Sequence, residues 1–452
     1  MKNTIAKLSL STFICCTALT PALSQLTISG QLRTRSELKD GQGTLLSKGA
    51  QPASFTSQRT RLNLDYKMDR LEFGLSLQDV RVWGQDVSTI NRTTTANNNG
   101  LKLQQAWADI LLSNPDVKNK SFSLKIGRQE LSYDDQRLLG ALDWLQQGRS
   151  HDAALLKYQD ASWMVNLGAA ENQNKENASG TIYVSTPPGN YTANTNGGAM
   201  YKSLQFFYAG KKLKKGAASF LFLADQFNKY ELDNADTKNY ENGGWGRMTT
   251  GLYFNNSFDN LNMTASAYYQ FGNNPIGQKL SAGLLSLYTN YNFNKKFSLG
   301  PGADYTSGGN SGNTSHNFDP LYGTPHKFWG SMDYFYVASP FGINGLLDYY
   351  LKATYKTANK FILSGGLHQF NSAKEISSYD VNGRKKNFGT ETDLTGNYQL
   401  NKAIGFEAGY SHFFATPLLA SSSVKNVANA SLNANWVYLM INITPDFLTY
   451  KY

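Results

Sequence analysis

The amino-acid sequence predicts an all-β fold, a transmembrane antiparallel β-barrel of about 18 strands. Three observations predict it: apolar and polar residues alternate along many segments, short turns alternate with long polar loops, and the chain contains 27 Tyr, 25 Phe and 40 Gly. Barrel strands are apolar on the lipid-facing side alone, and aromatic girdles lie at both interfaces, so a barrel explains this composition. The mean hydropathy of −0.44 excludes helical membrane spans, because such a span needs about 20 mostly apolar residues.

Alternation predicts the individual strands. On the segment 261–271, one face consists of Leu261, Met263, Ala265, Ala267, Tyr269 and Phe271. The same period of two occurs at 26–35, 59–66, 71–78, 404–411 and 437–443. A soluble β-sandwich also alternates, so the period alone does not distinguish it from a barrel.

Connection lengths favour the barrel. Tight turns are predicted at 67–70, 159–161, 258–260, 357–360 and 399–402. Long polar loops are predicted at 39–54, 84–100, 172–200, 230–244, 307–344 and 373–387. Short periplasmic turns alternating with long extracellular loops are typical of outer-membrane barrels, and about 18 strands would enclose an aqueous channel.

The N-terminal segment predicts export. Lys2 and Lys7 precede an apolar run at 8–19, and small residues follow at 22–24. This order is typical of a signal peptide, so we expect residues 1–24 to be cleaved and 25–452 to form the barrel in the bacterial outer membrane. Both cysteines, Cys15 and Cys16, lie inside the signal. Ile14 before Cys15 argues against a lipoprotein, and the mature chain would have no disulfide.

The C-terminus leaves two alternatives open. Pro445 cannot donate a hydrogen bond to a strand ladder. We therefore expect the last strand to stop near Thr444 and residues 445–452 to form a short tail. Alternatively, Leu448, Tyr450 and Tyr452 form an assembly signal at the barrel seam.

The basic charges predict a charged lumen. The formal net charge is +10, but the charges are dispersed and no basic helix is evident, which argues against nucleic-acid binding. Arg33, Arg35, Arg59 and Arg61 share the lumenal parity of adjacent strands, and later strands add Arg247 and Lys352. Acidic residues occur at the same parity: Glu72, Asp109, Asp348, Glu391, Asp393 and Glu407. These charges either form a track for an anionic solute or pair with one another and brace the wall.

No enzyme or cofactor motif is found. The sequence lacks Gly-x-Ser-x-Gly, His-Glu-x-x-His and a phosphate-binding glycine loop. His316 and His326 share a loop, where a polar role is favoured over a metal. Ser364 and His368 share a strand face, which is the single weak indication of a hydrolase. We predict a protein that is not an enzyme and has no cofactor.

Two sequence blocks resemble the alginate-export family of outer-membrane barrels. The first contains Gly-Arg-Gln-Glu-Leu at 127–131, Asp-Gln-Arg-Leu-Leu-Gly at 135–140, Asp-Trp at 143–144 and Gly-Arg-Ser-His-Asp at 148–152. The second contains Phe-Asp-Pro-Leu-Tyr-Gly at 318–323, His-Lys-Phe-Trp-Gly at 326–330 and Asp-Tyr-Phe at 333–335. The resemblance implies an 18-stranded barrel, a basic lumen that conducts an anionic polysaccharide, and loops that gate the pore.

The resemblance also implies pore residues. Arg128, Arg137 and Arg149 match arginines of the family's first block. Arg128 shares the parity of the lipid-facing residues before it, so either a bulge at Gly127 redirects it or it stands at the rim. Arg137 and the segment 143–144 lie in a loop that either folds inward as a constriction or packs over the barrel mouth.

The sequence therefore predicts an outer-membrane channel that passes a hydrophilic anionic solute, such as an acidic oligo- or polysaccharide, by diffusion. The candidate path residues are Arg33, Arg35, Arg59, Arg61, Arg128, Arg137 and Arg149. Outer-membrane lipid, lipopolysaccharide and the solute are the expected partners, and periplasmic secretion partners are left open. The alternatives are a surface-binding or adhesion barrel that acts through its long loops and, less favoured, an outer-membrane hydrolase.

Overall fold

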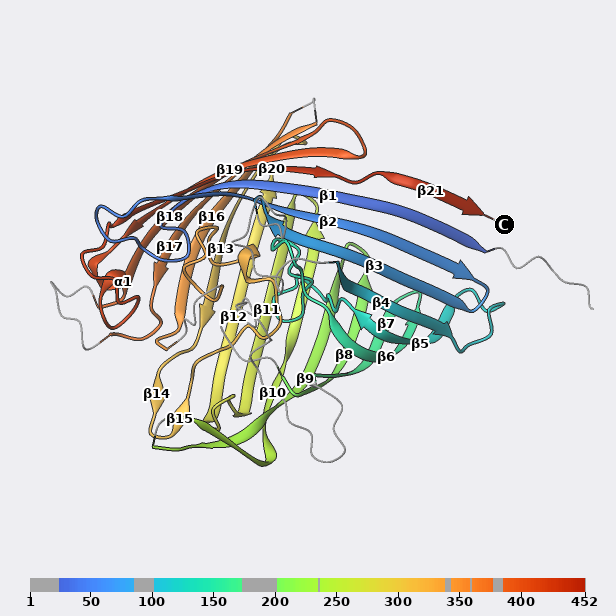
Figure 1. Cartoon of the computed structure of the whole chain (residues 1–452), viewed down its shortest axis with the longest axis horizontal. Coiled ribbons are helices and arrows are strands. Elements are labelled where there is room, and N and C mark those ends of the chain that lie inside the picture. The colour runs from blue at the N-terminus through green and yellow to red at the C-terminus, as the bar shows by residue number, and fades with distance from the viewer. Residues whose placement is uncertain are drawn as a thin grey trace, which may run out of the picture.

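The chain folds into a closed antiparallel barrel of 18 strands (Figure 1). The computed structural model describes residues 24–84, 101–172, 201–234, 236–337, 343–357, 360–376 and 385–451. The predicted signal segment, most of the loops 84–100 and 172–200, and parts of 307–344, 357–360 and 373–387 lie outside the described residues. Barrel closure satisfies every strand edge, which is what allows strands to cross lipid.

The barrel strands follow one another around the ring in chain order. They are β1 (Gln25–Asp40), β2 (Ala53–Met68), β3 (Leu71–Val82), β4 (Lys102–Leu111), β5 (Lys120–Gln129), β6 (His151–Asp160), β7 (Trp163–Glu171), β8 (Ser203–Leu213), β9 (Gly216–Leu232), β10 (Lys238–Phe258), β11 (Leu261–Asn273), β12 (Lys279–Asn292), β13 (Phe297–Thr306), β16 (Leu346–Lys356), β17 (Phe361–Asn371), β18 (Asn387–Gln399), β19 (Ile404–Ala415) and β20 (Asn433–Ile443), which β21 (Asp446–Lys451) continues. Short elements in the loops are β14 (Asn310–Ser311), β15 (Thr314–Ser315), the 3₁₀ turn η1 (Pro325–Lys327) and α1 (Pro417–Ala420).

The strand bounds confirm the predicted tight turns. All five predicted turns fall between consecutive antiparallel strands, and they gather at one end of the barrel, which we call the short-turn end. The prediction of a long loop at 230–244 is wrong. β9 and β10 continue through it, pairing Leu232 with Lys238, with a register shift between Tyr240 and Gly244. Most described residues of this hairpin are polar and exposed, as expected for strands that extend beyond the membrane into water.

The expectation of a C-terminal tail is also wrong. β1 pairs with β20 along its second half and with β21 along its first half, so the last strand continues to Lys451, opposite Gln25. Pro445 lies between the two pieces, and its carbonyl accepts a hydrogen bond from the Gly30 amide at 2.9 Å. The proline interrupts the ladder without ending the strand. Leu448 and Tyr450 therefore lie at the seam, opposite Ile28 and Leu26.

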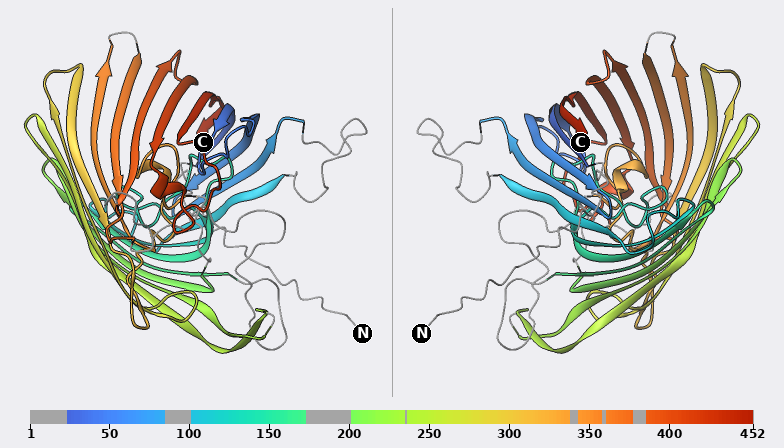
Figure 2. Two further views of the ribbon diagram at one scale, coloured as in Figure 1. Left: turned by 90° about the vertical axis from the view of Figure 1, so that its left-hand side faces the viewer. Right: turned by 90° about the vertical axis from the view of Figure 1, so that its right-hand side faces the viewer.

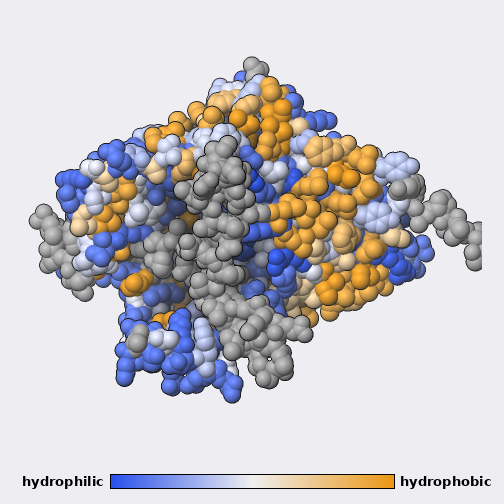
Figure 3. All heavy atoms as spheres, in the orientation of Figure 1, coloured by the Kyte–Doolittle hydropathy of each residue, from blue (hydrophilic) through white to orange (hydrophobic). Residues whose placement is uncertain are grey.

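The two faces of the barrel differ in polarity as the alternation predicts. The outer face exposes Leu62, Leu252, Leu285, Leu367 and Leu439, among others, and a broad hydrophobic area covers the strands at the right of Figure 3. The inner face carries the buried Arg33, Arg35, Arg59 and Arg247. Among the described residues, no helix is long and apolar enough to span a membrane.

Candidate functional site

Two loops fold into the lumen from the long-loop end of the barrel (Figure 2). The first, the strap, comprises residues 130–150 between β5 and β6; the second, the core loop, comprises residues 316–337 between β13 and β16. The Gly140 amide donates to the Tyr322 carbonyl at 2.9 Å, and the Tyr322 amide donates to the Leu138 carbonyl at 3.0 Å. These bonds join the loops into one unit, the plug. The inward fold that the sequence left as one of two options for the strap is the one observed.

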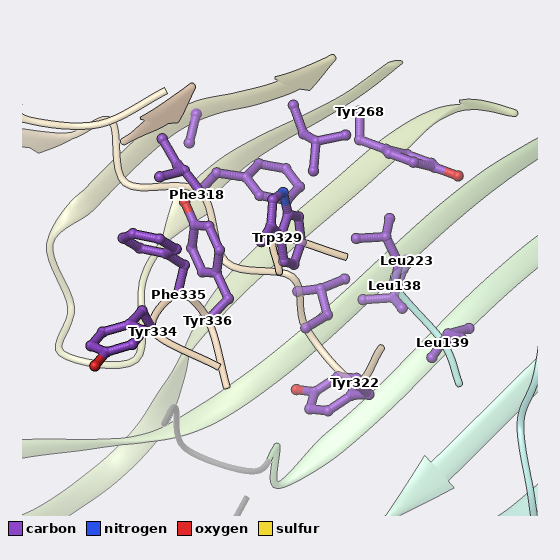
Figure 4. Packing of buried hydrophobic residues seen from close by; sticks show 14 of the residues in the cluster. Leu138, Leu139, Leu223, Tyr268, Phe318, Tyr322, Trp329, Tyr334, Phe335 and Tyr336 are labelled. Carbon is purple, nitrogen blue, oxygen red and sulfur yellow. The ribbon is translucent and has the colours of Figure 1, made fainter. Parts of the chain in front are cut away.

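The plug has a hydrophobic core shared with the inner wall. Figure 4 shows Leu138 and Leu139 of the strap near Leu223 of β9, with aromatic residues of the core loop beside them. The buried aromatic residues of the core loop are Phe318, Tyr322, Trp329, Tyr334, Phe335 and Tyr336. Full burial of such side chains stabilises by roughly 1.5–3 kcal/mol each. This packing holds the plug as a folded structure within the lumen.

One end of the strap is fixed by a buried ion pair, which we call the buried anchor. Arg137 Nη1 lies 2.7 Å from Asp304 Oδ2 of β13, and the two side chains are 3% and 2% exposed. Arg137 Nη2 also donates to Ser286 Oγ of β12 at 3.0 Å, and its guanidinium lies 3.8 Å from the centre of the Phe328 ring. With these partners the guanidinium is well satisfied away from water.

The same stretch of strap is fixed to a further part of the wall. Asp134 accepts hydrogen bonds from Tyr208 Oη of β8 and Ser219 Oγ of β9, both at 2.8 Å. Burial raises the pKa of Asp134, although the hydroxyl donors lower it. The strap is thus attached to β8, β9, β12 and β13 within four residues.

The core loop is attached to the wall by a second buried charge network. Arg247 of β10 bridges Asp225 of β9 at 2.6 Å and Asp319 of the core loop at 2.7 Å. Tyr322 Oη donates to the same Asp225 carboxylate at 2.6 Å. The sequence placed Arg247 on the inner wall but did not indicate these partners.

The C-terminal half of the core loop is held by two other strands, β18 and β13. The Met332 amide donates to Glu391 Oε1 of β18 at 2.8 Å, and the Tyr336 and Thr306 hydroxyls lie 2.6 Å apart. Glu391 thus braces the core loop through a backbone amide, and not through the pairing with a basic residue that the bracing interpretation predicts.

The other end of the strap lies in a cluster of arginines on β1 and β2. Asp143 of the strap is contacted by Arg59 at 2.8 Å, Arg33 at 3.3 Å and Arg61 at 3.7 Å. We call these three residues the arginine cluster. The Asp143 side chain is 59% exposed, whereas that of Arg59 is 1% exposed. Burial raises the pKa of Asp143, but Arg59, Arg33 and Arg61 lower it more, so the pKa lies below 3.8 and the group is ionised at neutral pH.

Trp144 adds a stacked contact beside the cluster. The guanidinium of Arg35 lies 4.3 Å from the centre of the Trp144 ring. The His326 ring of the core loop stacks on Trp144, with 4.2 Å between the ring centres and 13° between the ring planes. Arg35 also donates to the Trp144 carbonyl at 2.8 Å and to Glu37 at 2.9 Å. Trp144 of the strap therefore contacts both Arg35 of the barrel wall and His326 of the core loop.

A cavity of about 310 Å³ opens next to the arginine cluster. Its lining includes Arg33 and Asp143 together with Gln31, Lys360, Glu407 and Asn442. It runs along the inner wall below the strap toward the short-turn end, since Lys360 belongs to a predicted tight turn. At about 30 Å³ for each water, it could hold on the order of ten waters, so the cluster borders an aqueous space.

The structure separates the seven arginines predicted from the sequence. Arg33, Arg35, Arg59 and Arg61 gather at one end of the strap, and Arg137 lies at its other end. Arg149 is buried at the base of the strap, where its Nη1 donates to the Gly323 carbonyl at 2.7 Å and burial lowers its pKa to about 10.

Arg128 does not point into the lumen, which corrects its assignment as a pore residue. The β4–β5 register continues unbroken through Gly127, so the parity of Arg128 stays outward. It forms an ion pair with Asp152 at 2.7 Å at the long-loop end of β5, with both side chains about half exposed. The rim position considered from the sequence is therefore the one observed.

Three of the histidines, His368, His326 and His316, have hydrogen-bond partners that the sequence did not indicate. His368 Nδ1 lies 2.9 Å from Asp348 Oδ2, and its Nε2 lies 4.0 Å from Asp393 Oδ2, so carboxylates rather than Ser364 face both ring nitrogens. His326 binds Asp333 at 2.6 Å, and His316 Nδ1 lies 2.6 Å from the Ser281 carbonyl. Within the described ranges, no three potential ligands gather around a common point for a metal.

Comparison with known proteins gives a consistent result. The sequence profile of the alginate export family matches residues 24–420. The fold is similar to Pseudomonas aeruginosa OpdO (TM-score 0.58, 12% identity, 94% of this chain and 98% of that chain) and Acinetobacter baumannii OccAB4 (TM-score 0.60, 13% identity, 94% and 98%). It is also similar to Acinetobacter baumannii OccAB2 (TM-score 0.60, 11% identity, 94% and 98%). These are outer-membrane porins. No curated protein matches the sequence significantly.

Proposed function

The chain belongs to the alginate export family, and from this premise we propose that it is an outer-membrane channel through which a hydrophilic anionic solute, such as an acidic oligosaccharide, diffuses. An outer-membrane channel is what the family and the porin fold support. The anionic solute and the arginine-lined path are the parts that we add. Outer-membrane lipid and lipopolysaccharide are the proposed surroundings of the apolar outer face.

One observation carries the proposal: three arginines converge on the single exposed carboxylate of Asp143 beside a polar cavity. Guanidinium groups bind carboxylates in a planar, bidentate fashion, and in a narrow space they select anions. Two other lumenal arginines differ, because each has two acidic partners: Arg137 pairs with Asp304 and Asp135, and Arg247 pairs with Asp225 and Asp319. The cluster instead combines three cations on one acid with a cavity that Arg33 and Asp143 line.

The plug supports a narrow and selective path. An 18-stranded barrel has room for an aqueous channel, and two loops anchored around the ring reduce that room. The exposed strap residues border the remaining space, so a solute that passes the plug meets Asp143 and the cluster behind it.

Single-channel recording in planar bilayers tests the function. We expect discrete ion currents from the folded protein and, in a KCl gradient, a reversal potential that indicates anion preference. The double variant Arg33→Ala/Arg59→Ala should lose this preference. Arg128→Ala is the matched control, since its guanidinium faces outward. Absence of current through folded protein would reject the channel, and cation preference in the wild type would reject the anionic solute alone.

A further inference from the structure

We propose that the arginine cluster is a carboxylate-binding site that Asp143 occupies as an internal ligand, and that a carboxylate on the passing solute competes with Asp143 for it. This inference rests on the proposed function and specifies the group that the channel recognises: a carboxylate on a small hydrophilic molecule. It also assigns Asp143 a role, that of an internal ligand of the cluster.

The geometry of the contact supports exchange. One carboxylate faces three guanidinium groups, and Asp143 Oδ1 carries the contacts to both Arg59 and Arg61, at 2.8 and 3.7 Å. The Arg61 distance is long for a hydrogen bond, so the cluster does not hold Asp143 with the best geometry of all three partners. A second anion could improve that geometry.

Unused donors point to a ligand. Among the described residues, Arg59 Nε and Arg61 Nη2 are buried and have no hydrogen-bond partner. Buried donors on charged groups normally form hydrogen bonds, because a buried donor without a partner costs free energy. Arg59 is 1% exposed, so its unused donor belongs to the site and not to bulk water.

Access to the site is provided from one side. Arg33 and Asp143 both line the 310 Å³ cavity, and the Asp143 side chain is 59% exposed. An incoming carboxylate can therefore reach Asp143 and Arg33 from water without unfolding the plug. When Asp143 leaves, it moves into a solvated space and not into an apolar one.

The strap does not depend on Asp143 alone, so exchange leaves it in place. Arg33 also donates to Gln146 Oε1 at 3.0 Å and to the Leu145 carbonyl at 3.0 Å, and the buried anchor holds the other end of the strap. Displacement of Asp143 is thus a local change at the path, with the plug still folded.

The test measures how glucuronate blocks the single-channel current, with glucose as the uncharged analogue and acetate as the bare carboxylate. We expect glucuronate to bind and glucose not to bind. Asp143→Asn removes the competing charge and should lower the Kd for glucuronate about tenfold, whereas Arg61→Ala should raise it by a similar factor. Acetate should also bind, because it carries the carboxylate, and equal block by glucose and glucuronate would overturn the proposal.

A matched control separates competition from a general change of potential. Glu130→Gln also removes one negative charge, and Glu130 is close enough to Arg61 for their charges to interact. Its hydrogen-bond partner is Gln104 Nε2, at 2.9 Å, and not the cluster. If Asp143→Asn changes the Kd no more than Glu130→Gln does, the internal-ligand proposal is wrong, although the channel stands.

Two further measurements keep the outcomes distinct. Asp143→Ser provides a second variant if the asparagine variant does not fold, and it carries the same expectation. If the wild type conducts no current, the proposed function fails. Calorimetric titration of glucuronate into the detergent-solubilised wild type and Asp143→Asn then tests the site alone, and equal affinities would reject it.

Discussion

The two ends of the strap use the same chemical groups in different surroundings. At the buried anchor, Arg137 meets Asp304 with both side chains almost fully buried. At the arginine cluster, three arginines surround Asp143, which is more than half exposed. A buried pair cannot exchange partners without leaving a charge in a low-dielectric space, whereas an exposed carboxylate can. The comparison indicates that burial of the acid, and not the presence of arginine, separates a structural brace from the recognition site that we propose.

The largest test of this contrast is Arg137→Ala. It leaves the buried Asp304 without its cation, so we expect a loss of about 3–5 kcal/mol in the free energy of unfolding. Urea unfolding followed by heat-modifiable gel mobility measures it. The control is Arg137→Met/Asp304→Leu, which removes both groups of the buried pair, leaves the more exposed Asp135 as the remaining acid, and should lose less. A loss below about 1 kcal/mol for Arg137→Ala would contradict the assignment as a brace.

Arg59→Ala should have a smaller effect on stability and a larger one on selectivity. Asp143 remains hydrated and keeps Arg33 and Arg61, so we expect a loss of about 2 kcal/mol or less. In Arg59→Ala the reversal potential should shift toward the value for cation preference. Arg137→Ala should shift the reversal potential less. Equal losses of stability and of selectivity in Arg59→Ala and Arg137→Ala would contradict the contrast between the two ends of the strap.

Trp144→Ala tests whether the stack beside the cluster steadies the strap. Loss of the contacts to Arg35 and His326 should cost about 1–1.5 kcal/mol and increase open-channel current noise, because that end of the strap gains freedom. Trp144→Phe keeps an aromatic ring and should show less current noise than Trp144→Ala. Identical current noise in the wild type and in Trp144→Ala would show that the stack does not restrict the motion of the strap.

Lys425 offers a third kind of contact, a cation on a backbone carbonyl, and its effect on stability should appear only when the pH is changed. Its Nζ donates to the Tyr334 carbonyl of the core loop, and burial lowers its pKa to about 8 from 10.5. Between these values the unfolded chain keeps a proton that the folded chain has lost, so stability should rise with pH across pH 8–10.5 by up to about 3 kcal/mol. Urea unfolding at several pH values measures the rise, and Lys425→Met should remove it.

The sequence predicted the wall of the barrel better than its contents. Period-two alternation and short turns identify strands such as β11 because each residue's environment is set by its own strand. The hairpin at 230–244 was missed because its polar residues form strands in water, where no apolar face marks them. Pro445 was read as a stop because a local rule about proline does not reveal the long-range pairing with β1.

For the site, parity placed Arg33, Arg35, Arg59 and Arg61 on the inner wall. It also showed that Arg128 does not fit the lumen, and the structure places that residue at the rim. Parity gives a face but not a partner. That Asp304 receives Arg137 depends on how a loop crosses the lumen, which is a tertiary property. Asp304 has lumenal parity in its own strand, a signal that could have identified it as a candidate anchor.

The seam has a consequence for the order of assembly. The residues that close the ring, Gln25 at the start of β1 and Lys451 at the end of β21, are paired with each other although they lie near opposite ends of the described chain. No subset of strands can close, so every partly built sheet keeps two unpaired edges that invite association with other chains. Closure is therefore the last and most cooperative step, and contacts of such long sequence separation form slowly. A chain waiting for its final strand needs protection until the two ends meet.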